Sequence, residues 1–143
     1  MKFLNEQGQE ISLKRAENLP GYEVTLAEDT VIDSAVNNPF FKGINVLQLP
    51  KKLKGFRENS DLQRLLEPQA LETGIYLELS PEDYSIFIPS NNLLQNKKLI
   101  LVRNTFGAED AVLPLFVNFG LKKVKLSAGT VIGVLLIQTA KID

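Results

Sequence analysis

Residues 74–89 read GIYLELSPEDYSIFIP, and this stretch decides the fold class. Apolar side chains alternate with others from Gly74 to Leu79 and again from Tyr84 to Ile88, a pattern typical of half-buried β-strands. Between the two runs, residues 80–83 (Ser-Pro-Glu-Asp) are turn formers. The stretch therefore predicts two strands joined by a tight turn, with Pro89 ending the second.

Further strand-like runs lie on both sides of this stretch. They are Tyr22–Leu26, Thr30–Ile32, Lys98–Arg103, Val112–Asn118, Lys123–Leu126 and Thr130–Gln138. Short strands separated by turn residues are typical of an all-β sandwich or barrel. A chain of 143 residues has the size of one domain. We therefore predict a single all-β domain over residues 1–143.

One connection is longer and less regular than the others, from about residue 34 to residue 69. Within it, residues 60–67 (SDLQRLLE) predict a short helix, which Ser60 caps and Pro68 ends. The same insertion contains Phe40, Phe41 and Phe56. These aromatic rings form either a surface for a protein partner or a small core of their own, and the sequence does not separate the two.

The composition limits the chemistry. There is no Cys, hence no disulfide or thiolate zinc site, and no His, the commonest general base near neutral pH. The formal net charge is −1, and the lysine runs at 51–57 and 122–125 are of the kind that usually forms solvated surface, so we do not expect nucleic acid as a partner. No segment has the length of a membrane span or a signal peptide. We expect a soluble protein made in a cytoplasm.

Two polar loops have the composition of active-site loops. They are Pro89–Asn96, PSNNLLQN, and Asn104–Asp110, NTFGAED. Both lie between predicted strands and are rich in amides, carboxylates and turn formers. They are either a working site, the remains of one, or simply polar connections.

Several segments, taken in chain order, are similar to the motifs of one family. Residues 20–29 (PGYEVTLAED) resemble a Gly-Tyr-Asp-Leu motif followed by an acidic turn, and residues 71–84 (LETGIYLELSPEDY) resemble a Pro-Thr-Gly-Ile hairpin. Pro89 falls at the Pro of Pro-Arg-Ser-Gly-Leu, and Glu109 at the second Asp of Val-Ile-Asp-x-Asp-Tyr. Residues 128–135 (AGTVIGVL) are similar to Gly-Asp-Arg-Ile-Ala-Gln-Leu. With these motifs the chain resembles the trimeric dUTPases and their dCTP-deaminase relatives.

The resemblance covers most of the chain apart from the insertion and the extreme N-terminus. It implies a dUTPase-like distorted β-barrel or jelly-roll and a homotrimer. The apolar run Val131–Ile137 has the composition of a strand buried on both faces, which suits a subunit interface made from the final strands.

The residues that would carry the family's chemistry are replaced at the matching positions. Ser90 and Asn91 stand where the family has the phosphate-binding Arg and Ser, Gly107 where it has the water-activating Asp, Asp110 where it has the sugar-stacking Tyr, and Val134 where it has Gln. Glu23 keeps a carboxylate at the first-motif position. After the fourth motif we expect no Gly-rich, Arg-bearing arm. The resemblance therefore implies a degenerate pocket without a catalytic residue.

Two other interpretations of these positions stay open. Glu23, Glu109 and Asp110 could gather around a hard cation, although acidic turn residues more often face water, and we expect neither a metal nor a cofactor. Asn91 and Asn92 could bind a uracil-like edge, although Asn is common in turns because it tolerates left-handed backbone.

Together these features predict a non-catalytic trimeric module that acts as a structural or interaction protein. Its partners would be other protein subunits of a larger assembly, and a component of a virion, such as a head decoration or fibre subunit, is the specific hypothesis. That step is analogy, because viruses and phages carry many relatives of this family and fold alone does not fix function. The alternatives are a nucleotide-binding sensor and an atypical dUTP or dCTP pyrophosphatase.

Overall fold

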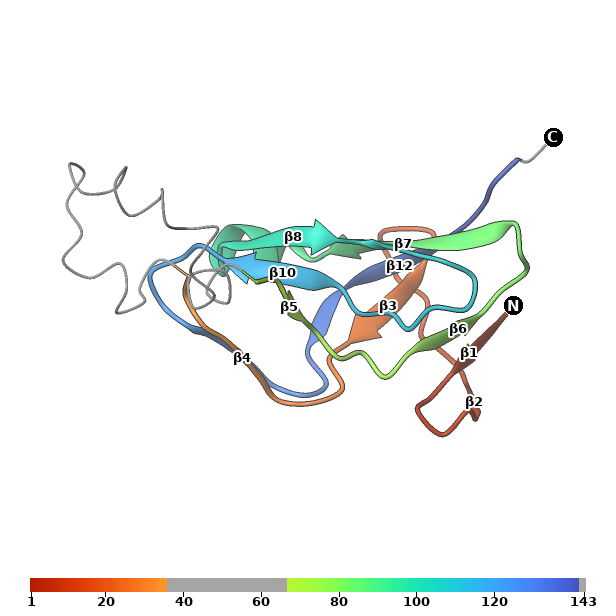
Figure 1. Cartoon of the computed structure of the whole chain (residues 1–143), viewed down its shortest axis with the longest axis horizontal. Helices are drawn as coiled ribbons and strands as arrows, with labels where there is room; N and C mark the ends of the chain where they lie inside the picture. Colours follow the sequence, from red (N-terminus) through yellow and green to blue (C-terminus); the bar gives the residue numbers. More distant parts are fainter. Residues whose placement is uncertain (36–66, 142–143) are drawn as a thin grey trace, which may run out of the picture.

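The computed structural model describes residues 1–35 and 67–141. Within these residues the chain forms short strands in four small sheets and one short helix, so the predicted all-β class is confirmed. Figure 1 shows the strands running along the long axis of the molecule, with both chain ends at the same end of it. No helix among the described residues is long and apolar enough to span a bilayer.

The largest sheet is built around the final strand. Its order is β3 (Tyr22–Thr25), β12 (Val131–Thr139), β7 (Asp83–Pro89) and β9 (Thr105–Phe106), all antiparallel. β12 lies between β3 and β7, and the strand expected at residues 130–138 is therefore present. Its burial alternates from Gly133 to Leu136 within one chain, so the expected burial on both faces is not seen there.

A second sheet holds the N-terminus. β1 (Lys2–Leu4) lies between β2 (Glu10–Ile11) and β6 (Tyr76–Glu78). The other edge of β6 is covered by residues 108–112, because Leu77 N–H donates to the Asp110 carbonyl and Leu79 N–H to the Ala108 carbonyl, both at 2.9 Å. The turn expected at residues 80–83 is present, with the Asp83 N–H donating to the Ser80 carbonyl at 2.9 Å. It joins β6 and β7 in different sheets, however, so the hairpin implied by the resemblance is wrong.

Two further sheets complete the barrel-like wall. β10 (Leu115–Asn118) lies between β5 (Gln69–Ala70) and β8 (Leu99–Arg103), and β11 (Val124–Leu126) pairs with β4 (Thr30–Ile32). Ser34 forms a parallel bridge with Asn118, while Gln69 pairs with Phe116. Both stems of the segment from 36 to 66 therefore attach to β10.

The core consists of apolar side chains contributed by all four sheets. Its fully buried members are Val24, Leu26, Ile32, Leu71, Phe87, Leu93, Leu99, Phe106, Val112, Phe116, Ile132 and Leu135. Phe87 and Phe116 meet edge to face, with ring centroids 6.3 Å apart, and so join the sheet of β12 to the sheet of β10.

The one helix among the described residues was not predicted. η1 (Asn92–Asn96) is a single π-helical turn in the stretch expected to be a polar loop, and it buries Leu93. The helix expected at residues 60–67 lies outside the described part of the chain except for its last residue. Residue 69, expected to be the last of the insertion, is the first residue of β5.

Candidate functional site

Glu23 and Val134 lie opposite each other on β3 and β12. The Glu23 carboxylate is half-buried and lies 3.5 Å from the Lys14 ammonium group, and the Glu23 N–H donates to the Lys14 carbonyl at 2.8 Å. Val134 is half-buried and also pairs with Ile88 on β7. This position of the sheet therefore presents one lysine-paired carboxylate beside aliphatic side chains.

Ser90 and Asn91 form the connection from β7 into η1. The Ser90 N–H donates to the Ile132 carbonyl at 2.9 Å, and its hydroxyl accepts a long bond from the Leu93 N–H at 3.4 Å. Asn91 is the residue before the helix, is exposed, and makes no capping bond with its side chain. Ser90 is thus occupied in shaping the local turn, and neither residue brings a positive charge.

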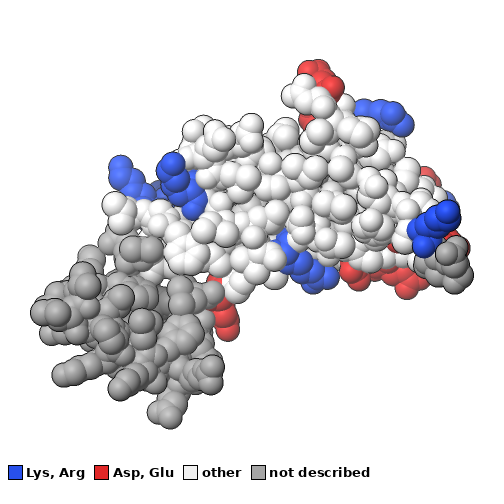
Figure 2. All heavy atoms as spheres, turned by 90° about the horizontal axis from the view of Figure 1, so that it is seen from above, with Lys and Arg blue, Asp and Glu red and all other residues white. Residues whose placement is uncertain are grey.

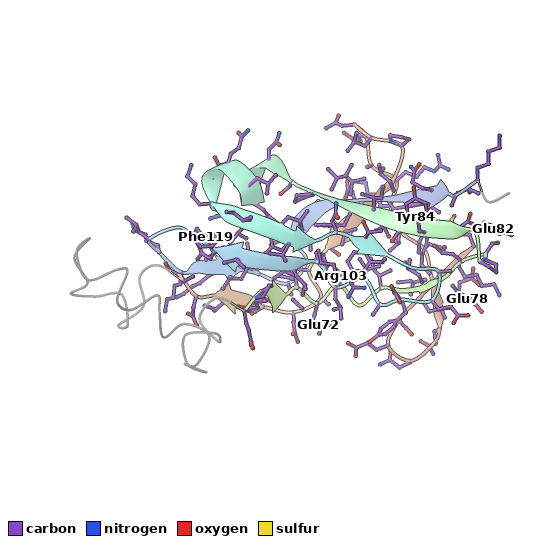
Figure 3. The ribbon with its side chains drawn as sticks, turned by 45° about the horizontal axis from the view of Figure 1, so that its top comes forward. Glu72, Glu78, Glu82, Tyr84, Arg103 and Phe119 are labelled. Carbon is purple, nitrogen blue, oxygen red and sulfur yellow. The ribbon has the colours of Figure 1, made fainter. Side chains whose placement is uncertain are left out.

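Gly107 and Asp110 close a tight turn between β9 and β10. The Gly107 N–H donates to the Asp110 carboxylate at 2.7 Å, and the Asp110 N–H donates back to the Gly107 carbonyl at 3.3 Å. The Arg103 guanidinium lies 3.5 Å from the same carboxylate and 5.2 Å from the centroid of the Phe106 ring. Glu109, in the same turn, is exposed. Figure 3 shows Arg103 near the middle of the molecule.

The seven predicted pocket positions fall into two groups within one chain. Glu23, Val134, Ser90 and Asn91 lie around one end of β7 and β12, whereas Gly107 follows Phe106, which is paired with Ser85 near the other end of β7. Ser85 and Ser90 are five residues apart, or roughly 16 Å along an extended strand. A single chain therefore does not bring the two groups into one pocket.

Of the three carboxylates considered for a cation, Glu23 lies in one of these groups, and Glu109 and Asp110 lie in the other. Glu23 lies beside Lys14, and Asp110 beside Arg103. No group of three or more possible metal ligands occurs in the described part of the chain. The candidate partner-binding residues Phe40, Phe41 and Phe56 lie outside the described residues.

A surface cavity of about 1300 Å³ lies elsewhere, between the end of η1 and the loop after β10. None of the seven pocket positions lines it, and five lysines do: Lys97, Lys98, Lys122, Lys123 and Lys125. The sequence showed the run at 122–125, which was interpreted as solvated surface. It did not show that Lys97 and Lys98 join this run, because the two groups are more than twenty residues apart and only the fold brings them together.

Comparisons with known proteins agree with the architecture. No protein-family model and no curated protein matches the chain. The solved dUTPase of Streptococcus mutans matches with a TM-score of 0.66 and 13% identity, over 100% of this chain and 98% of that one. The EIAV dUTPase gives a TM-score of 0.62 and 10% identity, over 99% and 90%. The dUTPase of Staphylococcus bacteriophage 80alpha matches with a TM-score of 0.63 and 9% identity, over 98% of this chain and 89% of that one.

These matches extend over almost the whole chain at very low sequence identity. The protein therefore has a dUTPase-like fold, as the motifs predicted. At this identity the likeness concerns the fold alone, and the function has to be argued from the residues.

Proposed function

We propose that this chain is a non-catalytic dUTPase-like module that acts as a structural or interaction protein. The observation that carries the proposal is the turn from Gly107 to Asp110. The position that the resemblance assigns to the water-activating Asp has no side chain, and the carboxylate three residues later is bound to the Gly107 N–H and the Arg103 guanidinium. One oxygen of this carboxylate, Oδ2, is therefore already engaged by the Gly107 N–H and the Arg103 guanidinium in holding the turn, and is not free to bind an attacking water.

The phosphate side of the site also lacks its chemistry. Ser90 and Asn91 are neutral, and Val134 offers only methyl groups. Arg103 is the cation nearest to the turn in sequence, and it is paired with Asp110. Transition states of phosphate chemistry are stabilised by preorganised cations, so this arrangement supports a scaffold more than a hydrolase.

The homotrimer in this proposal is supported by the outer face of the central sheet. Ile86 and Ile88 on β7 pair with Leu136 and Val134 on β12, and all four are half-buried. They alternate with the buried Phe87 and Leu135, so they lie on the face of the sheet away from the core. Gly21 covers part of this aliphatic face. A neighbouring copy would cover the rest, and closed symmetry is the usual way to do so.

An interaction role agrees with what is described for one protein of the same fold. The dUTPase of bacteriophage 80alpha controls the transfer of virulence genes by a G protein-like mechanism. For this chain we favour a role within a larger assembly, with a virion component such as a head decoration or fibre subunit as the specific form. The alternatives are a nucleotide sensor, which needs binding without hydrolysis, and an atypical pyrophosphatase.

The deciding experiment measures pyrophosphate release from dUTP and dCTP with Mg²⁺. We expect no turnover by the natural chain. Loss of a general base lowers the reaction rate by about 10²–10⁴-fold, and loss of a charge partner lowers it by about another 10²–10³-fold. Gly107→Asp should also be inactive, since the cationic clamp is still absent. Turnover of about one per second by the natural chain would refute the proposal.

Calorimetric titration with a non-hydrolysable dUTP analogue separates the scaffold from the sensor. Micromolar binding without turnover would favour the sensor. Absence of binding, together with particle-sized complexes in sedimentation of the native source material, would favour the structural role.

A further inference from the structure

Five lysines surround the cavity between η1 and the loop after β10. Its lining includes Lys97, Lys98, Lys122, Lys123 and Lys125, with Asp33 as the only acidic residue among the described ones. No ion pair involves any of the five lysines within the described part of the chain. Figure 2 shows some of the Lys and Arg side chains at the end of the molecule at which η1 lies, and others elsewhere on the same face.

The first pair of lysines is placed by the end of the helix. Lys97 follows η1 as its C-cap, and its N–H donates to the Asn92 carbonyl at 3.0 Å. Lys98 then adopts a φ of 58°, the left-handed region that non-glycine residues rarely occupy. This sharp change of direction takes the chain into β8 and holds both lysines at the rim of the cavity.

The second set of lysines belongs to a loop that is held from the inside. Asn118 is 1% exposed, and its amide donates to the Ile32 carbonyl at 3.0 Å and to the Lys122 carbonyl at 2.9 Å. Its side-chain oxygen accepts from the Gly120 N–H at 2.9 Å. The Ser34 hydroxyl also donates to the Gly120 carbonyl. The lysines are therefore presented by a defined loop and not by a frayed connection.

An aromatic ring lies within the same loop. Phe119 lines the cavity and is 48% exposed, and Leu121 is 72% exposed. Figure 3 shows Phe119 on the side of the molecule where η1 lies. Phe119 and Leu121 therefore place exposed apolar surface directly beside the ammonium groups of the same cavity.

We propose that this cavity binds single-stranded nucleic acid, with phosphates at the lysines and a base stacked on Phe119. Proteins that bind single strands combine a positively charged groove with exposed aromatic rings. A duplex hides its base faces and would use only the lysines, as would an acidic peptide without aromatic residues, whereas every base of a single strand offers a face to stack on Phe119. The proposal does not depend on whether the chain hydrolyses nucleotides, so it stands or falls separately from the function proposed above.

The test is fluorescence anisotropy of the full chain with a labelled oligothymidylate of about ten nucleotides, within the usual range of site sizes. Lys122→Gln/Lys123→Gln should weaken binding at least tenfold. For single strands the logarithm of the affinity falls by about 0.7 per phosphate neutralised for each tenfold increase in salt. The double variant should therefore lower the salt slope by about 1.4.

Phe119→Ala tests the aromatic part of the proposal. We expect a loss of about tenfold in affinity with the salt slope unchanged, because stacking does not neutralise a phosphate. Phe119→Tyr should retain the affinity. If Phe119→Ala binds as well as the natural chain and a duplex binds as tightly as the single strand, the assignment to single strands is wrong.

Two matched variants identify the source of binding. Lys2→Gln/Lys141→Gln removes the same charge at the opposite end of the molecule and should leave the affinity unchanged; a loss equal to that of the cavity variant would show non-specific attraction and overturn the proposal. Lys51→Gln/Lys52→Gln, outside the described residues, should have the smaller effect. If it alone abolishes binding, or if polyglutamate displaces the oligonucleotide at equal concentration, the cavity is not a nucleic-acid site.

Discussion

Ser85 and Thr73 are both buried hydroxyl residues, and their surroundings differ. The Ser85 hydroxyl is fully buried on β7 and has no hydrogen-bond partner among the described residues. The Thr73 hydroxyl donates to the Val112 carbonyl at 2.6 Å. A buried polar group without a partner destabilises the fold, whereas a bonded one contributes to stability.

Removing the two hydroxyl groups should therefore have opposite effects. We expect Ser85→Ala to leave the free energy of unfolding unchanged or to raise it by up to about 1 kcal/mol. Thr73→Val, which keeps the side-chain shape, should lower it by about 1 kcal/mol. Urea denaturation of both variants checks the pair. A clear loss of stability in Ser85→Ala would mean that its hydroxyl has a partner.

Asn118 is the polar residue on which the loop after β10 depends. Asn118→Ala leaves the Ile32 carbonyl and the Gly120 N–H without their partner, and should lower the free energy of unfolding by about 2–3 kcal/mol. Asn92→Ala is the matched control, since it removes an exposed amide bonded only to Asn96 and should change stability by less than about 0.5 kcal/mol. Equal effects of the two substitutions in chemical denaturation would contradict the role of Asn118.

At the scale of elements, β12 contains the tightest contact of the central sheet. A Cβ atom at Gly133 would overlap the Ile88 carbonyl and lie 2.6 Å from the Phe87 ring. The family motif has Ala at this position, so the large Phe87 ring and the glycine fit each other. Gly133→Ala should lower the free energy of unfolding by about 1–3 kcal/mol through overpacking.

Val131→Ala on the same strand is the control for this prediction. Val131 is 44% exposed, so we expect a change below about 0.5 kcal/mol. Thermal unfolding followed by circular dichroism compares the two variants. If Gly133→Ala has the same melting temperature as the natural chain, the close contact between β12 and β7 is wrong.

The strands could be predicted because their signals are local, and η1 could not. Alternation identified β6 and β7, and the apolar run identified a strand at the place of β12. η1 is a single turn without a capping side chain, and its bonds run to the backbone of Ser90, which no periodicity reveals. The lysine cavity and the separation of Gly107 from Ser90 also depend on long-range packing. The site residues named from the sequence therefore stay a prediction, and their distribution over two places in one chain could not be predicted from it.

At the scale of the whole molecule, two apolar faces are candidates for the contact with a second copy of the chain. One is the outer face of β7 and β12, with Ile86 and Leu136. The other is β8, where Ile100 is 50% exposed and Val102 is 54% exposed. The final strands are the predicted interface, so the first face is expected to be the one that a second copy covers.

Light scattering with matched charge variants tests this expectation. The natural chain should have the mass of a trimer at micromolar concentration. Leu136→Lys should have the mass of a monomer, because burying an unpaired ammonium at an interface is strongly unfavourable. Ile100→Lys should keep the mass of the trimer. Leu136→Gln is a milder change at the same position, and circular dichroism of both Leu136 variants checks that dissociation is not caused by unfolding. A stable natural monomer, or dissociation by Ile100→Lys alone, would contradict the prediction.

Ser34 and Gln69, on either side of residues 36–66, both pair with β10. Leu99 occupies one edge of β10 opposite Asn118, so Ser34 and Gln69 share the other edge, at positions two residues apart. We expect replacement of residues 36–66 by a glycine-serine linker of about six residues, which spans such a gap, to leave the thermal midpoint nearly unchanged. Loss of cooperative unfolding in that variant would show that the barrel needs the segment.

In polymer terms, residues 36–66 are a loop whose two ends are held close together by their pairing with β10. The entropy of closing a loop grows only with the logarithm of its length, so doubling the segment would cost about 0.6 kcal/mol. We therefore expect folding of the barrel to tolerate insertions and deletions between Ser34 and Gln69 at little cost. Selection can change what this end of the molecule contacts while the barrel stays the same.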